Sequence, residues 1–241
     1  ITGLSRPVLA ETLDQVGRLL ASSRLLDMAI TGEADIPPMV DAFFRGDYDF
    51  LQQSENIHLP GFYTHTGNWR LAAAEGQTIV VQDGSDYLGR LSAGLAGMMT
   101  TMIGKTYLEI LDNIGAYFYF PLAIAKESYL EAGSAQVRVL PVSGRIDQAA
   151  GLAFGIRNVG NYFVFRVNTL EEDVALFEFV NNKRYKRTSA AASLTPGHWY
   201  ELRVDFAEHH CLCWLDGKPQ LDYTATRPLD GYLGLWTKAD A

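Results

Sequence analysis

Short segments in which apolar and polar residues alternate, separated by turn residues, fill the chain from 137 to 238 and constrain its fold more than any other feature. Segments of strand length, rich in β-branched and aromatic residues, occur at 151–156, 161–168, 174–180, 199–206, 211–215 and 232–238. The connections between them are short and contain turn dipeptides such as Asp216-Gly217, so we expect antiparallel hairpins. Antiparallel meanders bury their apolar faces between two sheets, which predicts a mainly β, two-sheet antiparallel sandwich.

The N-terminal region has helical rather than strand periodicity. Apolar residues recur at helical spacing through 8–20, and Pro37-Pro38 suits a first helical turn, where proline is tolerated. We therefore expect residues 1–56 to form a helical extension that packs on a sandwich of residues 57–241. A chain of 241 residues is long enough to form such a sandwich as one domain.

A second helical pattern interrupts the expected sandwich at about 85–113. In the helix expected at 86–103, leucines and methionines form one apolar stripe. The opposite side carries a row of small residues, Gly89, Ala93 and Gly97, which would let another helix of this chain or of a protein partner approach closely. The apolar run is shorter than the roughly twenty residues that cross a bilayer, so no membrane span is expected.

The chain is acidic, with a formal net charge of −8 and a pI near 5.1. Nucleic acids and anionic membrane surfaces are bound by basic surfaces, so we expect neither as a partner. Residue 1 is an isoleucine, and no charged segment followed by an apolar one stands at the start. The sequence therefore contains no recognisable signal peptide, which leaves the compartment open.

No motif in the sequence predicts a metal, a cofactor or an activated nucleophile. Cys211 and Cys213 lie in one expected strand, where their side chains share a face about 6–7 Å apart, so we expect buried thiols rather than a disulfide. The preceding His209-His210 pair is split between two faces, and no second cluster completes four metal ligands. Gly104-Lys105-Thr106 resembles the end of a phosphate-binding loop, but Met99 stands where its first glycine is needed. The sequence also lacks a Gly-x-Ser-x-Gly elbow.

Alternation places polar and aromatic side chains together on one side of the expected sheet. They come from the strand at 161–168 and from the last strand, and the opposite faces of both strands are apolar and suit the core. An indole beside arginine, lysine and amide groups suits sugars, because it offers apolar stacking next to directional hydrogen bonds. The candidate ligand-binding residues are Tyr162, Arg166, Asn168, Trp236, Lys238 and Asp147.

A purely structural interpretation of the same face stays open. Arg166 can form an ion pair with Asp147 or Asp240, and Trp236 can fill the space beneath a helix. The two interpretations differ in whether the face around Trp236 is open to solvent.

Several short motifs resemble one known family of sandwiches. They are 141–152, Asn161-Tyr162, Leu170-Glu171 with Val174-x-Leu176, Asn182-Lys183-Arg184 and 234–240. From about Tyr117 to its C-terminus the chain resembles the concanavalin A-like lectin/glucanase sandwich and, within it, the domain family named for 3-keto-disaccharide hydrolases. The resemblance implies a jelly roll whose concave sheet often forms a carbohydrate groove, and a periplasmic or extracellular location. Gly155 and Ile156 depart from the family, which usually carries arginine and tyrosine there.

The resemblance implies two classes of function. Some members are hydrolases or lyases that act on oxidised glycosides, whereas many others have no known reaction. The glucanase relatives place three acids on one strand face, but Glu178 falls on the face opposite to Glu171 and Asp173, which disfavours glucanase chemistry. We therefore expect a non-catalytic carbohydrate-binding or assembly module. The alternative is a glycoside hydrolase or lyase acting on 3-keto-disaccharides or related glycans, for which the sequence nominates no catalytic residue.

The end of the chain gives a last expectation. In the family it resembles, the segment corresponding to 234–240 is followed by another strand, whereas this sequence ends at Ala241. A missing strand exposes backbone donors and acceptors that invite pairing. We therefore expect that the natural polypeptide continues past Ala241, or that a strand from elsewhere in this chain or from a protein partner fills the vacant place.

Overall fold

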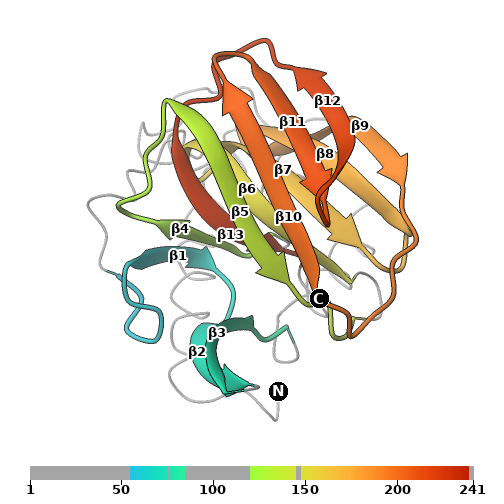
Figure 1. The fold of residues 1–241 in the computed structure, drawn as a ribbon. Coiled ribbons are helices and arrows are strands. Elements are labelled where there is room, and N and C mark those ends of the chain that lie inside the picture. Colours follow the sequence, from blue (N-terminus) through green and yellow to red (C-terminus); the bar gives the residue numbers. More distant parts are fainter. Residues whose placement is uncertain (1–54, 75, 85–119, 145–147, 239–241) are drawn as a thin grey trace, which may run out of the picture.

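The computed structural model describes residues 55–74, 76–84, 120–144 and 148–238, which form an antiparallel β-sandwich (Figure 1). The first strands are β1 (Phe62–Thr66), β2 (Trp69–Ala74), β3 (Gln77–Gln82), β4 (Leu122–Ala125), β5 (Ala132–Val139) and β6 (Ala149–Asn158). They are followed by β7 (Asn161–Asn168), β8 (Asp173–Val180), β9 (Lys183–Ala191), β10 (Tyr200–Ala207), β11 (His210–Leu215), β12 (Lys218–Thr224) and β13 (Tyr232–Thr237).

Some of the sequence-based expectations fall outside these residues. They are the helices expected before residue 55 and at 85–113, with Gly89, Ala93, Gly97 and Asp147. Within the residues that the structure describes, no helix is long and apolar enough to cross a membrane.

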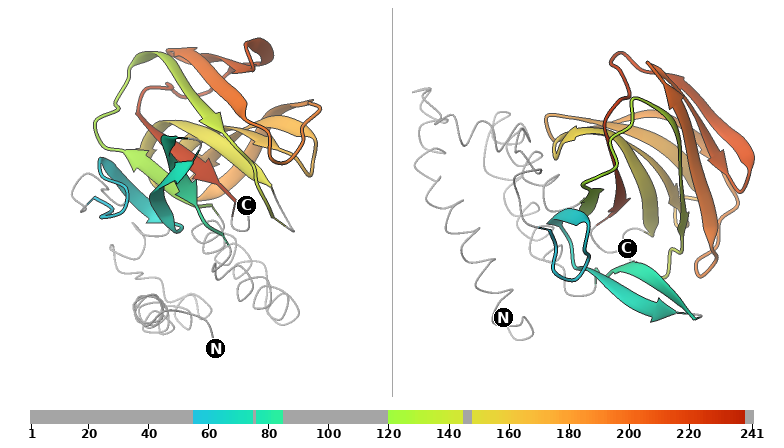
Figure 2. Two further views of the ribbon diagram at one scale, coloured as in Figure 1. Left: turned by 60° about the horizontal axis from the view of Figure 1, so that its bottom comes forward. Right: turned by 60° about the vertical axis from the view of Figure 1, so that its left-hand side comes forward.

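Two sheets and a hairpin make up the described fold. The large sheet has seven strands in the order β1-β4-β13-β6-β7-β8-β9, and the small sheet has four in the order β12-β11-β10-β5. All of these pairings are antiparallel, and so is that of the separate β2–β3 hairpin. The two sheets lie face to face, as the right-hand view of Figure 2 shows. The predicted two-sheet antiparallel sandwich is therefore confirmed.

The main core fills the space between the two sheets. The large sheet contributes Phe154, Phe163, Phe165, Val167 and Leu176, and the small sheet contributes Leu202, Val204, Phe206, Cys211 and Cys213. Both cysteines are free and buried, as their spacing predicted. Contact with Cys211 and burial raise the pKa of the Cys213 thiol, so it stays neutral inside the core.

The outer face of the large sheet is also apolar and buried. Its cluster, which we call the second core, includes Phe120, Leu122, Ile124, Ala153, Tyr162, Val164, Phe177, Phe179 and Trp236. In β7 every residue from Tyr162 to Asn168 is buried, and in β8 every residue from Val174 to Phe179. The open polar face that the ligand-binding interpretation expected for β7 is therefore wrong. The residues in the middle of both strands are mostly apolar, because both faces of these strands are covered.

The last strand lies inside the large sheet. β13 is hydrogen-bonded to β4 on one side and to β6 on the other, so no vacant place adjoins it in the described part of the chain. β9 and β12 are outer strands of the two described sheets. Pairing of another strand with such an edge, and continuation of the chain past Ala241, stay predictions.

Gly155 marks an irregularity in β6 that accounts for one departure from the family pattern. The β6–β7 register shifts between Phe154 and Asn158, and Gly155 has a φ of 55°. A Cβ at this position would lie 2.9 Å from the carbonyl oxygen of Leu229. Arg227 donates from two guanidinium nitrogens to the Gly155 carbonyl oxygen, each at 3.3 Å. The backbone therefore excludes an arginine at position 155.

A buried carboxylate ties β8 to β9 and to the segment before β13. Glu178 has a side chain that is 2% exposed and lies opposite Phe163 in the β7–β8 register, on the inner side of the large sheet. Arg187 lies 2.7 Å from its Oε2, and Arg227 Nε donates to its Oε1 at 3.2 Å. The Arg227 guanidinium also lies 4.2 Å from the centre of the Phe163 ring. One carboxylate thus pairs with two arginines at the border of the main core.

Replacing Glu178 with alanine should lower the free energy of unfolding by about 3–5 kcal/mol, because it leaves both arginines without a counter-charge. Denaturant titration measures the loss. The matched control is Asp222→Ala: Asp222 pairs with His210 at 2.7 Å, but its side chain is 73% exposed. Breaking such a surface pair should cost less than about 1 kcal/mol. Equal losses in the two variants would contradict a structural role for Glu178.

His65 in β1 has a ring nitrogen that is enclosed. The residue as a whole is only partly buried, but its Nε2 is shut off from solvent. Burial lowers the pKa of His65 from 6.5 to about 3. The folded state therefore holds the neutral ring, whereas the unfolded chain takes up a proton once the pH falls below 6.5.

His65 should make the stability of the fold sensitive to acid. Its contribution to the free energy of unfolding is complete above pH 6.5 and falls by about 1.4 kcal/mol per pH unit as the pH drops toward 3. Between about pH 7.5 and about pH 5 the loss should be about 2 kcal/mol. Urea titrations at the two pH values measure it, and His65→Gln should lose correspondingly less. The same loss in both proteins would show that His65 is not the group responsible.

Candidate functional site

Charged side chains gather at one margin of the outer face of the large sheet, around the turn between β7 and β8. We call them the rim cluster, and its members are Arg166, Glu171, Asp173, Lys186 and Lys238. Arg166 NH2 donates to Glu171 Oε2 at 2.7 Å, and its NH1 donates to Asp173 Oδ1 at 2.9 Å. Lys186 Nζ lies 3.4 Å from the other oxygen of Asp173. Lys238 lies close enough to Glu171 for its charge to lower the pKa of that carboxyl.

The rim cluster has a buried base and an exposed top. The side chain of Arg166 is 4% exposed and that of Asp173 is 15% exposed. Glu171 and Lys186 have side chains that are 49% and 47% exposed. Arg166 is therefore an anchor beneath the surface, and Glu171 and Lys186 are the groups that a ligand could reach.

The turn between β7 and β8 places Glu171 over Arg166. Asn168 Oδ1 accepts hydrogen bonds from the backbone N–H groups of Leu170 at 3.0 Å and of Glu171 at 3.3 Å. This Asx turn is completed by Glu172, which has a φ of 49°. Asn168 is buried and its Oδ1 serves the backbone, so the structure places it as the residue that shapes the turn.

The surroundings of Glu171 keep it ionised. Burial raises its pKa, but the hydrogen bond and charge of Arg166, with the charges of Lys238 and Lys186, lower it by more. The net pKa of Glu171 lies below its ordinary value of 4.5. At neutral pH this carboxylate therefore accepts hydrogen bonds and has no proton to donate.

Arg166 has partners other than those the sequence suggested. The structural interpretation paired it with Asp147 or Asp240, both of which lie outside the described residues. The pairing with those two residues stays a prediction, and the structure shows ion pairs of Arg166 with Glu171 in the turn that follows its own strand and with Asp173 at the start of β8. Alternation predicted which face Arg166 occupies, but it does not encode how the turn folds back over that face.

Trp236 lies inside the second core and not on an open surface. It is 1% exposed, and its ring stacks on Phe120 with the ring centres 5.5 Å apart. Phe120 meets Phe179 edge-on at 5.1 Å, and Tyr162 stacks on Phe179 at 4.3 Å. Tyr162 and Trp236 do lie on the same side of the sheet as Arg166, as alternation predicted. The open indole expected from the sequence is not present, because Trp236 is buried in the second core with Phe120 stacked on its ring.

Trp236→Ala should therefore lower the free energy of unfolding by about 3–5 kcal/mol, because it opens a cavity in the second core. Guanidinium titration measures the change. Trp214→Ala, in a partly exposed position on the small sheet, is the control and should cost clearly less. A folded Trp236→Ala protein of unchanged stability would mean that the ring is not packed as described.

The partly exposed tryptophans of the chain are Trp214 in the small sheet and Trp199 just before β10. The guanidinium carbon of Arg138 lies 5.2 Å from the centre of the Trp199 ring, and that of Arg203 lies 4.3 Å from the Trp214 ring. Each ring therefore already has a cation over one face, which leaves less indole surface for a sugar.

The structure separates the six candidate residues into distinct groups. Arg166 and Lys238 belong to the rim cluster, Tyr162 and Trp236 to the second core, Asn168 to the turn, and Asp147 to the part of the chain outside the described residues. Sequence reasoning missed Lys186 as a member of the site. The side of the sheet on which Lys186 lies can be predicted only from the strand register. In that register Lys186 lies opposite Phe177, on the same side as Arg166.

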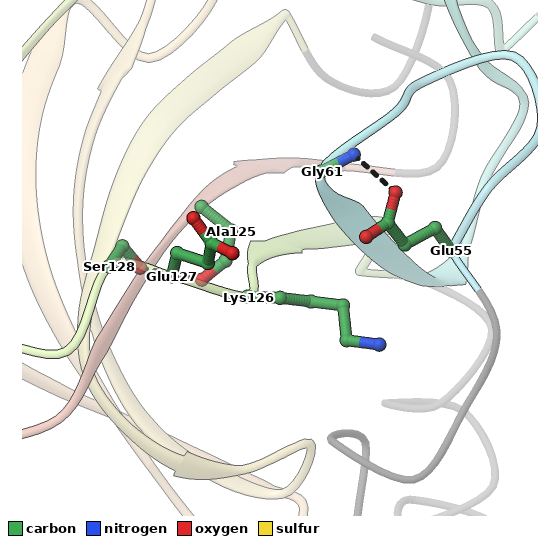
Figure 3. Close-up of a pocket in the computed structure, with 6 residues that line it drawn as sticks. All are labelled: Glu55, Gly61, Ala125, Lys126, Glu127 and Ser128. Carbon is green, nitrogen blue, oxygen red and sulfur yellow. Dashed lines mark hydrogen bonds between the residues drawn. The ribbon is translucent and has the colours of Figure 1, made fainter.

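A shallow depression lies between the start of the described chain and the end of β4. Glu55, Gly61, Ala125, Lys126, Glu127 and Ser128 line it (Figure 3). Its volume is about 580 Å³, and Glu55 Oε2 accepts a hydrogen bond from the Gly61 N–H at 2.8 Å. Ser128 Oγ donates to the Ala125 carbonyl and accepts from the Leu233 N–H, so it serves the backbone. None of the described lining residues is aromatic, so they offer no surface for stacking.

Potential metal ligands are dispersed in the described segments. No group of three or more His, Cys, Asp or Glu side chains there is placed to hold a metal ion. His210 Nε2 lies 2.7 Å from Asp222 on the surface, whereas Cys211 points into the main core.

Neither a family model nor a curated protein matches the chain, but solved structures do. The carbohydrate-binding module CBM66 from Bacillus subtilis matches with a TM-score of 0.53 and 13% identity, over 75% of this chain and 89% of its own. Sheep galectin-11 has a TM-score of 0.38 and 14% identity, over 46% of this chain and 86% of its own. The β-glucanase of Bacillus licheniformis has a TM-score of 0.38 and 9% identity, over 49% of this chain and 57% of its own.

The chain has the concanavalin A-like jelly-roll sandwich that the sequence resemblance implied. The finer resemblance, to the domain family named for 3-keto-disaccharide hydrolases, stays a prediction.

Proposed function

We propose that this chain is a non-catalytic carbohydrate-binding domain whose ligand lies over the rim cluster. The observation that carries the proposal is the pairing of a half-exposed Glu171 carboxylate with a buried Arg166, beside the exposed ammonium of Lys186. The Glu171 carboxylate accepts hydrogen bonds and the Lys186 ammonium donates them. Arg166, which lies beneath the surface, keeps the carboxylate in place.

This arrangement suits the hydroxyl groups of a sugar. Vicinal hydroxyls donate to a carboxylate and accept from an ammonium, and hydrogen bonds to charged groups are stronger than those between neutral groups. Because Glu171 is held by Arg166 and by the Asx turn, little side-chain entropy is lost when a sugar binds. The site is an exposed margin and not a deep pocket, which favours a chain or a terminal unit that lies across the surface.

The fold comparison supports the same class of function. The carbohydrate-binding module from Bacillus subtilis is named for carbohydrate binding, and its fold matches most of this chain. At 13% identity the likeness concerns the fold alone, so the rim cluster must carry the argument for this protein. A glycan ligand also fits the periplasmic or extracellular location that the resemblance implied.

The state of the carboxylates favours binding over hydrolysis. Glycoside hydrolysis needs one carboxylic acid that is protonated when the reaction begins. Glu171 is instead kept ionised, and Asp173 is bonded to Arg166 and Lys186. Glu178, the remaining acid of the glucanase-like triplet, lies on the inner side of the sheet with two arginines.

Glu171→Ala should weaken glycan binding about tenfold or more, which corresponds to at least about 1.4 kcal/mol, because it removes the charged acceptor from the surface. A glycan array followed by isothermal titration with the best ligand measures the change. Glu131→Ala, at an exposed position just before β5, is the matched control and should bind as the wild type does. Absence of binding across the array, or equal binding by the two variants, would overturn the proposal.

A further inference from the structure

A tyrosine ring is held on the surface near the starts of β5 and β13, at the top of the sandwich in Figure 1. Tyr129, in the connection from β4 to β5, is 49% exposed, and its hydroxyl donates to Asp230 Oδ2 at 2.6 Å. The residues that follow these two, Leu130 and Gly231, exchange two backbone hydrogen bonds of 3.0 Å each. The two segments are thus joined beside the ring, which is both fixed in position and exposed.

An arginine and a second tyrosine complete this group, which we call the tyrosine cluster: Tyr129, Arg157, Asp230 and Tyr232. Arg157 NH2 donates to Asp230 Oδ1 at 2.7 Å, so the carboxylate binds the phenol with one oxygen and the guanidinium with the other. The rings of Tyr129 and Tyr232 meet edge to face, with their centres 5.2 Å apart. The side chains of Arg157 and Asp230 are 47% and 29% exposed. A ring, a guanidinium and a carboxylate therefore reach the surface side by side.

The hydrogen bonds fix the protonation of the tyrosine cluster. The hydrogen bond from Tyr129, with the charge of Arg157, lowers the pKa of Asp230 below its ordinary value. The same hydrogen bond raises the pKa of the Tyr129 hydroxyl. At neutral pH the carboxylate is ionised and the phenol keeps its proton. An ionised carboxylate accepts more than two hydrogen bonds and a guanidinium has several N–H groups, so Asp230 and Arg157 can each bond to a ligand as well.

The face of the Tyr129 ring differs from those of other exposed rings. Trp199 and Trp214 each have a guanidinium over the ring, and Tyr185 has the guanidinium carbon of Arg187 at 5.1 Å from its ring centre. Among the residues that the structure describes, no cation lies over the ring of Tyr129, whose ring contact is another tyrosine. Tyr129 therefore offers ring surface for stacking, next to hydrogen-bonding groups that are already held in place.

The tyrosine cluster and the rim cluster lie at opposite ends of β6. Ala149, the first residue of β6, stands opposite Asn168, whose side chain shapes the turn that carries Glu171. Arg157 is the last residue but one of the same strand, roughly 25 Å further along at the rise of an extended chain. One sugar unit cannot contact both clusters over that length.

We infer that the tyrosine cluster is a second carbohydrate subsite, which binds a neutral pyranose unit whose C–H face stacks on Tyr129. The inference rests on the proposed carbohydrate-binding function for its class of ligand, although it uses none of the residues of the rim cluster. Hydroxyl groups at the margin of the sugar accept from Arg157 and donate to Asp230. The sugar is neutral because stacking is an apolar contact and the charge of Arg157 is already paired with that of Asp230.

The test uses neutral oligosaccharides and variants at the ring. Cellohexaose, laminarihexaose, mannohexaose and xylohexaose are titrated into the wild type, and the variants are measured with each hexasaccharide that binds. For at least one, Tyr129→Ala should weaken binding about tenfold or more, because it removes the stacking surface. Tyr129→Phe keeps the ring and loses only the hydrogen bond to Asp230, so it should weaken binding less than Tyr129→Ala.

Two further variants show whether the loss is specific. Arg157→Ala should weaken binding about fivefold or more, because it removes a charged donor beside the ring. Trp214→Ala is the matched control, because it removes a partly exposed aromatic ring that already has a guanidinium over it, and binding should be unchanged. Thermal unfolding of all the variants checks that they are folded.

Comparison with Glu171→Ala separates this inference from the function on which it rests. Equal binding by the wild type, Tyr129→Ala and Arg157→Ala would overturn the inference, and a loss in Glu171→Ala would then leave the proposed function standing. A loss in Tyr129→Ala but not in Glu171→Ala supports the subsite and removes the rim cluster as the binding site, whereas losses in both support both.

Three other results also decide the matter. If Trp214→Ala weakens binding as much as Tyr129→Ala does, the loss is not specific and the inference is wrong. If no neutral hexasaccharide binds but a charged glycan does, the inference is wrong while carbohydrate binding stands. If no glycan of any kind binds, both the inference and the proposed function are wrong.

Discussion

The structure depends on burial of both faces of the central strands of the large sheet. Along β7, Phe163 and Phe165 point into the main core, whereas Tyr162 and Val164 point into the second core. Full burial of one large apolar side chain contributes about 1.5–3 kcal/mol, so two such faces hold the middle of the sheet firmly. They also leave no room there for a polar ligand. Charged groups are consequently confined to the ends of the central strands and to the edge strand.

Two ion-pair sites include a carboxylate of β8, and they show how the position of a charged group in the sheet decides its role. Glu178, on the inner side, is almost completely buried and pairs with two arginines, so it serves the fold. Asp173 stands at the first residue of the same strand, on the outer side, and shares Arg166 with the half-exposed Glu171. Both sites contain carboxylates and guanidinium groups. They differ in exposure, and exposure decides which of them a ligand can reach.

Most of the sandwich could be predicted from the sequence, whereas the candidate site could be predicted only in part. Alternation correctly placed Trp236 and Arg166 on one side of the sheet, because side-chain direction in a strand follows from period two alone. It could not show that Phe120, from a segment before β4, covers Trp236, because that contact joins positions far apart in the chain. The ion pairs of Arg166 were missed for a related reason, since they depend on a turn built by the Asn168 side chain.

The strand order explains why cations gather on β9. β9 has a neighbour on one side only in the described sheet, and natural proteins commonly place cations on such strands to prevent unwanted pairing. Protection against strand pairing needs charged side chains along the edge strand, but it does not require them to point to one face of the sheet. In β9, however, Arg184 and Lys186 point to the outer face and lie over Phe177, the ring that Arg166 also contacts. The edge strand thereby brings its charge to the margin where the Glu171 carboxylate is exposed, and the second core closes the rest of that face.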